Sequence, residues 1–295
     1  MDYVILDLEW NGTYSSKRKG FLNEIIEFGA IKLDQELKLV DRFHQMVRPQ
    51  VGKRLNGKVR ELTRISHEEL AVGNPFLHVA KRFSQWAGKD TTLLTWGTGD
   101  LLALLDNYKY YTKKVQIPFL NRYLDLQSYV QNRLGLPSDK QLGLLPAAEL
   151  LGISTEEAEH HRALEDCELA YLCLQKTYKG SDLSEEAQLA DKEFFRKLTF
   201  KTTVLSDLNN PLVDHSQMFF DCDRCGRRAS RASGWELRNR VFRARFQCDY
   251  CNRPFYGKVQ FRLKYEGPVV WKKIAEIEGQ TAQAEAVAED SATGG

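Results

Sequence analysis

The chain has 295 residues, which is enough for two average domains, and its 42% hydrophobic and 28% charged residues are typical of a soluble protein. No apolar run approaches the ~20 residues of a membrane-spanning helix, and the chain's opening residues lack the basic start of a secretory signal. We therefore expect a cytoplasmic protein with no membrane partner.

Charge is distributed unevenly along the chain. Residues 218–273 hold fourteen basic and five acidic residues, a net charge of +9, whereas 1–217 carry −2 and 274–295 carry −5. A block this basic favours a polyanionic partner such as nucleic acid. An ordinary charged surface is the alternative.

Hydrophobic patterning predicts an α/β domain over 1–180. Short apolar runs predict strands at 3–8, 25–33, 37–47, 92–96 and 122–124, with a basic loop at 11–20. A capping box at 66–69 and helical spacing predict helices after residue 66 and at 76–87, 100–110, 126–134, 144–151 and 162–178. Because short loops join the first three strands, we expect them to be antiparallel, in a mixed five-stranded sheet flanked by helices.

The chain changes character after residue 180. The polar segment 181–217 is predicted to be a linker that is helical around 187–198. Cysteines, aromatics and short alternating runs predict a small β-rich module over 218–273. The acidic segment 274–295 has almost no large apolar residues and is predicted to be disordered.

Acidic residues follow two of the predicted strands in the first domain. Asp7 and Glu9 are two apart on a strand, so their carboxylates point to one face, and Asp100 lies between a strand and a helix. Carboxylates of this kind are natural ligands of Mg²⁺ and Mn²⁺. Taken alone, each also fits a plain structural role: solvated strand-end acids for Asp7 and Glu9, and a helix cap for Asp100.

The predicted last helix of this domain carries a fourth acid. Asp166 lies near an apolar stripe, where a carboxylate needs a partner and a metal ion would serve. Two histidines, His160 and His161, precede it near the start of the helix, and spacing alone does not choose between them. Either could equally be an exposed histidine at a helix start.

Together these motifs resemble the DEDDh 3′→5′ exonuclease family of ribonuclease-H-like folds. The similarity rests on Val4-Ile-Leu-Asp-Leu-Glu9, Trp96-Gly-Thr-Gly-Asp100 and the spacing His161-x-x-x-x-Asp166, in the family's order. It selects His161 over His160. It departs from the family at Trp10, where many relatives carry a small hydroxyl residue near the terminal nucleotide, and at Arg64, where a glycine is common; both bear on substrate preference.

The resemblance implies a mechanism and a cofactor. Asp7, Glu9, Asp100 and Asp166 would hold two Mg²⁺ or Mn²⁺ ions around the scissile phosphate, and His161 would take the proton of the attacking water. Single-stranded RNA or DNA would then lose nucleoside 5′-monophosphates from its free 3′ end.

Four cysteines form two spaced Cys-x-x-Cys pairs. Cys222, Cys225, Cys248 and Cys251 fit one structural Zn²⁺ held by four thiolates, in a module that resembles a zinc ribbon. Redox-active or unligated cysteines are the alternatives. Cys167 and Cys173, in the predicted last helix of the first domain, have no such pairing, and we expect Cys167 to be a buried small apolar residue.

The zinc module is predicted to contact the substrate. Its arginines Arg238, Arg240, Arg243 and Arg245 lie in a stretch predicted as one strand and are expected to line a face. Trp235, Phe242 and Tyr256 could stack bases beside them, although Phe242 and Phe246 could equally form the module's core. Two other functions remain open: a non-catalytic nucleic-acid adaptor, and a protein-interaction scaffold that docks through the ribbon.

Overall fold

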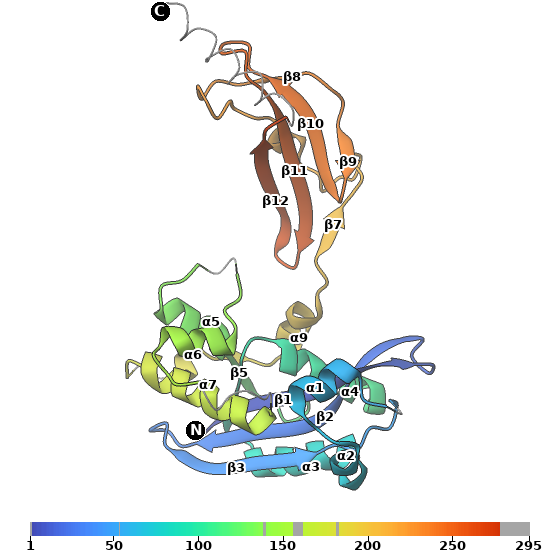
Figure 1. Ribbon diagram of the computed structural model, residues 1–295, viewed down its shortest axis with the longest axis vertical. Helices are drawn as coiled ribbons and strands as arrows, with labels where there is room; N and C mark the ends of the chain where they lie inside the picture. The colour runs from blue at the N-terminus through green and yellow to red at the C-terminus, as the bar shows by residue number, and fades with distance from the viewer. Residues whose placement is uncertain (1, 53, 138–139, 156–161, 181–182, 278–295) are drawn as a thin grey trace, which may run out of the picture. The chain divides into compact units, whose positions relative to one another are not determined.

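The computed structural model describes residues 2–52, 54–137, 140–155, 162–180 and 183–277 (Figure 1). The chain divides into two compact units, the first ending at Thr199 and the second beginning at Phe200. Each unit has its own sheet and its own hydrophobic core.

The first unit is built on a mixed sheet with strand order β3-β2-β1-β4-β5-β6. The strands are β1 (Asp2–Ser15), β2 (Gly20–Leu33), β3 (Leu39–Met46), β4 (Thr91–Thr95), β5 (Arg122–Asp125) and β6 (Gln188–Leu189). The first three are antiparallel, and β4 and β5 run parallel to β1. This confirms the predicted mixed sheet. The sixth strand, β6, pairs antiparallel with β5 and was missed because a strand of two residues gives no periodicity.

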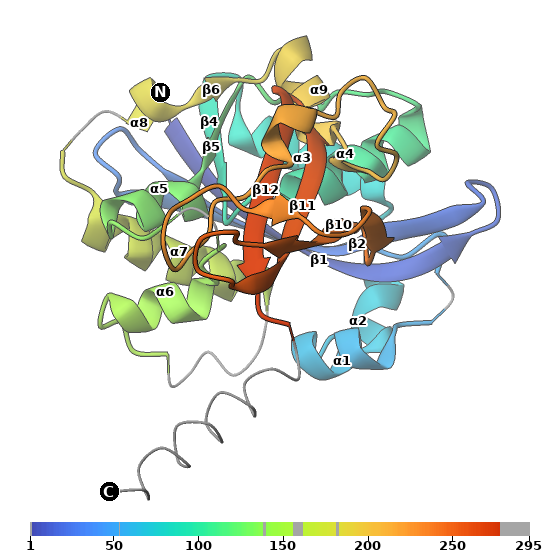
Figure 2. The same cartoon turned by 90° about the horizontal axis from the view of Figure 1, so that it is seen from above.

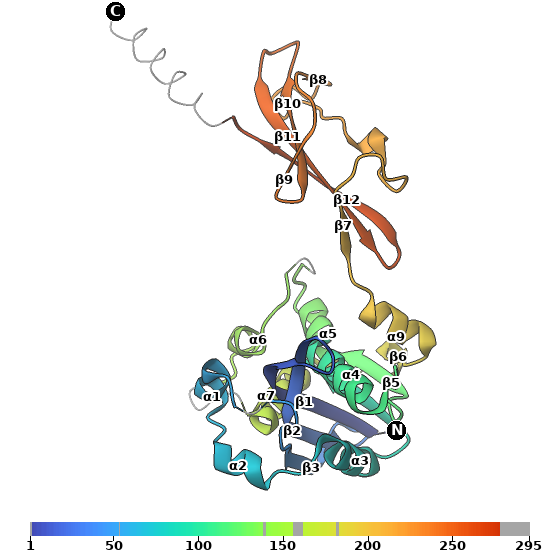
Figure 3. The same cartoon turned by 90° about the vertical axis from the view of Figure 1, so that its right-hand side faces the viewer.

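Helices cover both faces of this sheet (Figure 3). Alternation along β1 explains the two layers: Val4 and Leu6 pack with α3 and α4, whereas Tyr3 and Ile5 pack with α5, α6 and α7. The helices are α1 (Gly57–Thr63), α2 (His67–Val72), α3 (Phe76–Ala87), α4 (Gly99–Thr112), α5 (Leu126–Arg133), α6 (Leu144–Leu150), α7 (Ala163–Thr177), α8 (Leu183–Glu186) and α9 (Lys192–Thr199). None of the described helices is long and apolar enough to span a membrane.

The predicted basic loop at 11–20 is wrong, because β1 and β2 stay paired until Ser15 and Gly20 (Figure 2). Tertiary contacts hold the strands where the sequence is polar. The carboxylate of Glu24, which is 1% exposed, accepts hydrogen bonds from the backbone N–H groups of three consecutive residues, 50–52. Such contacts between distant segments override weak local strand propensity.

The helix expected in the linker belongs to the first unit. It is α9, and its Phe195 is 5% exposed and packs into the core beside α3. Phe194 lies against Tyr123 of β5, with ring centroids 5.5 Å apart. The first unit therefore continues past the boundary predicted at residue 180.

The second unit is a small sheet with strand order β12-β11-β10-β8, with β7 added to β11 and β9 to β10. Its elements are β7 (Thr203–Leu205), the 3₁₀ helix η1 (His215–Gln217), β8 (Ser230–Arg231), β9 (Glu236–Arg238), β10 (Val241–Gln247), β11 (Pro254–Lys264) and β12 (Gly267–Ala275). One sheet face is packed tightly against the preceding segment: a Cβ on Gly257 would lie 2.6 Å from the rings of Phe220 and Phe246.

Candidate active site and cysteine cluster

Three of the predicted carboxylates meet on one face of the first unit's sheet. Asp7 and Glu9 alternate with apolar residues on β1 and so point to the face that α7 covers. Asp166 lies in the first turn of α7. One oxygen atom from each of the three carboxylates lies within 4.8 Å of the others, close enough to share a metal ion.

A glycine on β2 lets α7 approach this closely. Gly29 pairs with Asp7, and a Cβ at this position would lie 2.2 Å from the carbonyl carbon of Ala163. The helix backbone therefore rests directly on the strand, and the Cys167 thiol donates to the Gly29 carbonyl oxygen at 3.2 Å. Cys167 and Cys173 are both buried, as expected for Cys167.

Asp100 reaches the same site from α4. It lies in the first turn of that helix, but the N-cap residue is Thr98. The Asp100 Oδ1 atom instead accepts a hydrogen bond of 3.0 Å from the backbone N–H of Leu8, between the two β1 acids. The helix-cap alternative is therefore wrong, and this carboxylate is held against β1.

Burial and mutual repulsion raise the pKa values of Asp7, Glu9 and Asp100. Burial raises the pKa of Asp7 well above its usual value, and Asp100, Asp166 and Glu9 raise it further. Burial, followed by the charge of Asp166, raises the pKa of Glu9 to about 8, and burial raises that of Asp100 to about 7. Clustered acids of this kind ionise together only if cations neutralise them, so the oxygen-rich cluster fits Mg²⁺ or Mn²⁺.

The acids line an open cleft of about 580 Å³. A bulge in the β1–β2 pairing falls between Glu9 and Trp10, and Trp10 faces the cleft together with Trp96. Two short helices, α1 and α6, contribute the remaining apolar wall, formed by Val59, Leu62, Leu144, Leu145 and Pro146. A cleft with carboxylates at one side and aromatic and aliphatic walls suits a ligand with a phosphate and a flat ring.

A buried ion pair beside the acids was missed in the sequence. The carboxylate of Glu27, on β2, is fully buried and accepts from Arg162 Nη2 at 2.7 Å and from His44 Nε2 at 2.7 Å. Arg162 is the N-cap residue of α7, and the next backbone N–H, of Ala163, donates to the same carboxylate at 3.3 Å. Glu27 therefore ties the start of α7 to the sheet. Its signal was a lone acid inside the apolar run at 25–33.

The predicted base His161 and its competitor His160 lie outside the described residues. The described part of the chain resumes at Arg162, the residue held by Glu27. The structure thus brings together Asp7, Glu9, Asp166, Asp100 and Trp10 in the first unit.

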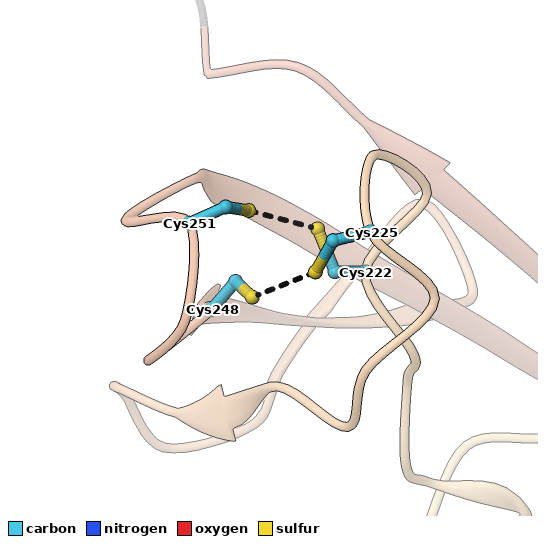
Figure 4. Close-up of side chains that lie close together, drawn as sticks. All are labelled: Cys222, Cys225, Cys248 and Cys251. Atoms are coloured by element: carbon cyan, nitrogen blue, oxygen red, sulfur yellow. Dashed lines mark hydrogen bonds between the residues drawn. The ribbon is translucent and has the colours of Figure 1, made fainter.

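The four predicted zinc cysteines cluster in the second unit (Figure 4). The Sγ atoms of Cys222 and Cys251 are 3.5 Å apart, and those of Cys225 and Cys248 are 3.4 Å apart, too far for a disulfide. Zn–S bonds of ~2.3 Å in a tetrahedron place sulfur atoms ~3.8 Å from one another, so the cluster fits one Zn²⁺. Backbone N–H groups of Cys251 and Tyr250 lower the pKa of the Cys248 thiol to about 6, which favours its thiolate.

The four predicted substrate-binding arginines do not share one strand. The stretch folds into a hairpin, because Asn239 and Arg240 adopt positive φ values of 49° and 63° and form the turn between β9 and β10. Arg243 and Arg245 lie on one face of β10, and Arg238 on β9 shares that face of the sheet because it is the direct partner of Val241, whereas Arg240 lies in the turn. Phe242 and Phe246 point the other way and are core residues, 3% and 1% exposed.

Comparisons with known proteins agree with this geometry. A family model described as exonuclease (RNase T) matches residues 4–174, more than half of the chain. The probable 3′-5′ exonuclease KapD of Bacillus subtilis is 31% identical over 174 residues, which cover 57% of this chain and 80% of that protein. The 3′-5′ exoribonuclease 1 of Rattus norvegicus is 25% identical, over 62% of this chain and 55% of the relative.

The fold is also shared with a solved structure. The nuclease domain of 3′hExo, a DEDDh family member bound to rAMP, superposes with a TM-score of 0.53 at 22% identity. The alignment covers 65% of this chain and 96% of that domain.

Proposed function

The chain belongs to the RNase T exonuclease family, and we propose that it is a metal-dependent 3′→5′ exonuclease acting on single-stranded RNA or DNA. The observation that carries the proposal is the meeting of Asp7, Glu9 and Asp166 within 4.8 Å, with Asp100 bonded to the strand between them. Free 3′ ends would be shortened with release of nucleoside 5′-monophosphates. A non-catalytic adaptor would not need a repulsive acidic cluster, which destabilises the fold.

The four carboxylates would bind two Mg²⁺ or Mn²⁺ ions, which when bound supply an activated water and neutralise charge at the scissile phosphate. Asp7 and Glu9 from the strand and Asp166 from the helix come close enough together that all three would be ligands of these ions. The backbone N–H of Leu8 fixes one oxygen of Asp100 beside the β1 acids, where the carboxylate would complete the ligand set. His161 would accept the proton of the water, as expected of an imidazole near neutral pH.

The cleft walls would position the terminal nucleotide. Trp10 and Trp96 offer flat apolar surfaces beside the acids, and base stacking on such rings tolerates every base. Leu62 of α1 and the apolar start of α6 would exclude water from the other side of the ring. This arrangement orients the last phosphodiester bond towards the carboxylates without reading sequence.

In the second unit, Cys222, Cys225, Cys248 and Cys251 would hold one structural Zn²⁺. A closed site with four thiolates has no open position for substrate, so this ion would stabilise the fold.

The activity is tested with 5′-labelled single-stranded RNA and DNA of one sequence in Mg²⁺ or Mn²⁺. We expect a ladder shortened from the 3′ end, absent with EDTA and with Asp7→Asn. The matched control is Asp90→Asn, which makes the same chemical change at an exposed position outside the cleft and should leave the ladder intact. A ladder that persists in Asp7→Asn, or no ladder in the wild type on either substrate, would refute the proposal.

A further inference from the structure

The sheet of the second unit has one covered and one open face. The covered face carries the aromatic core that packs on Phe220. Strand register places a different set of side chains together on the open face: Arg243, Arg245, Tyr256, Lys258, Trp271 and Lys273. We call this set the basic face.

Three cations stand side by side across the basic face. Arg243 of β10 is the direct partner of Lys258 on β11, and Lys258 is the direct partner of Lys273 on β12. Directly opposed residues have Cβ atoms ~5 Å apart, and like charges in such pairs destabilise a sheet. Among the described residues, neither lysine has a carboxylate within 4 Å; only Arg243 has one, Glu236 at 3.6 Å. The repulsion among these three cations is relieved when a polyanion binds across the row.

Two aromatic side chains accompany the cations. The Arg243 guanidinium lies 4.4 Å from the ring centroid of Tyr256, and Arg245 Nε donates to the Tyr256 hydroxyl at 3.3 Å. Trp271, opposite Gln260, keeps 45% of its surface exposed. Exposed aromatics interleaved with cations suit unpaired bases and their phosphates.

We propose that the basic face is a second nucleic-acid site, which binds a single-stranded segment of the molecule whose 3′ end is degraded. This inference rests on the proposed exonuclease function for the identity of its ligand. The cations contact phosphates and Trp271 stacks on a base, so the site is insensitive to sequence. Charge selects a polyanion, and the exposed indole selects a single strand over a duplex, whose bases are already stacked.

The test is a binding titration with the full zinc-loaded chain carrying Asp7→Asn, so that the probe is not degraded. The probe is a fluorescent single strand of about 20 nucleotides, with the corresponding duplex as comparison. Neutralising two contacts in Lys258→Gln/Lys273→Gln should make the slope of log affinity against log salt shallower by about 1.4. The matched control, Lys113→Gln/Lys114→Gln, removes two exposed lysines of the first unit and should leave the slope unchanged. Trp271→Ala should weaken binding about tenfold at an unchanged slope.

Cleavage of a dinucleotide by the same lysine variant, in the otherwise wild-type chain, separates this inference from the proposed function. We expect this cleavage to be unchanged, because a dinucleotide occupies only the first unit's cleft. Three outcomes would each overturn the inference: a salt slope in the lysine variant equal to that of the control, an equal loss of single-strand and duplex binding in Trp271→Ala, or impaired dinucleotide cleavage in the lysine variant. Failure of the wild type to cleave any substrate would overturn the proposed function. The binding titration would still test whether the basic face binds a single strand.

Discussion

Replacing Glu27 by glutamine should destabilise the first unit and loosen the start of α7. The Glu27 carboxylate is fully buried and receives the Arg162 guanidinium at 2.7 and 3.0 Å. Glutamine keeps the shape but turns one acceptor into a donor, which would face Arg162 or the Ala163 N–H. The variant thus leaves a cation partly buried without its counter-charge.

The magnitude follows from the burial of the pair. Removing one partner of a buried ion pair costs about 3 to 5 kcal/mol. Arg162 is 24% exposed and can recover some hydration, so we expect the free energy of unfolding to fall by about 2 to 3 kcal/mol. Burial raises the pKa of Glu27, but the hydrogen bonds from His44 and Arg162 outweigh it and lower the pKa below 4.5. The stabilisation is therefore present above pH 4.5 and is lost as the pH falls through the folded-state pKa.

Urea unfolding of the full chain, with zinc present and at neutral and acidic pH, measures this effect. The matched control is Glu165→Gln, which removes an exposed carboxylate from the same first turn of α7 and should cost less than ~1 kcal/mol. Exonuclease activity should also fall in Glu27→Gln, because Asp166 lies one turn beyond Arg162. This account would be refuted if Glu27→Gln lost no more unfolding free energy than Glu165→Gln. It would also be refuted if the difference in unfolding free energy between Glu27→Gln and the wild type persisted at low pH.

Three further outcomes are expected. In the metal-free protein the raised pKa values of Asp100, about 7, and Glu9, about 8, mean that the folded state holds extra protons, so the melting temperature should fall as the pH rises from about 4 to 8. Mn²⁺ should raise the melting temperature of the wild type again but should raise that of Asp7→Asn much less. Without metal, Asp7→Asn should melt at a higher temperature than the wild type. Equal Mn²⁺-induced shifts in the two proteins would contradict the acidic cluster as the metal site. Zinc removal or Cys248→Ser should unfold the second unit and leave the first folded, seen by calorimetry as loss of one transition; an unchanged scan would argue against a structural zinc. Trp10→Ala should raise KM about tenfold with little change in kcat, and a loss confined to kcat would place Trp10 outside substrate binding.

The sequence predicted the layers of the first unit well, because its strands are apolar runs and its helices have regular spacing. It failed where the backbone is held by distant contacts. The β1–β2 hairpin continues through polar residues because Glu24 is anchored to residues 50–52. The helix α9 was assigned to a linker because its amphipathic pattern does not reveal which surface Phe195 packs against.

The acids of the candidate site were predictable because their spacing and order carry information. Asp7 and Glu9 follow from strand alternation, and the sheet order places β1 beside β4, whose end leads to Asp100. Glu27 was not predicted, since its partner Arg162 is 135 positions away. The single arginine strand was predicted incorrectly, because two positive φ values turn it into a hairpin and remove Arg240 from the face that Arg238, Arg243 and Arg245 share.

The contact at Gly29 changes how inactive relatives of this fold should be recognised. The α7 backbone touches the strand where a side chain would stand, so a substitution at Gly29 would push the helix off the strand and move Asp166 away from Asp7. A chain could therefore keep every acid and still lose its catalytic geometry. A survey of sequences that scores only the acidic residues would count such a chain as an active nuclease. A survey that also requires glycine at the position of Gly29 would recognise it as inactive.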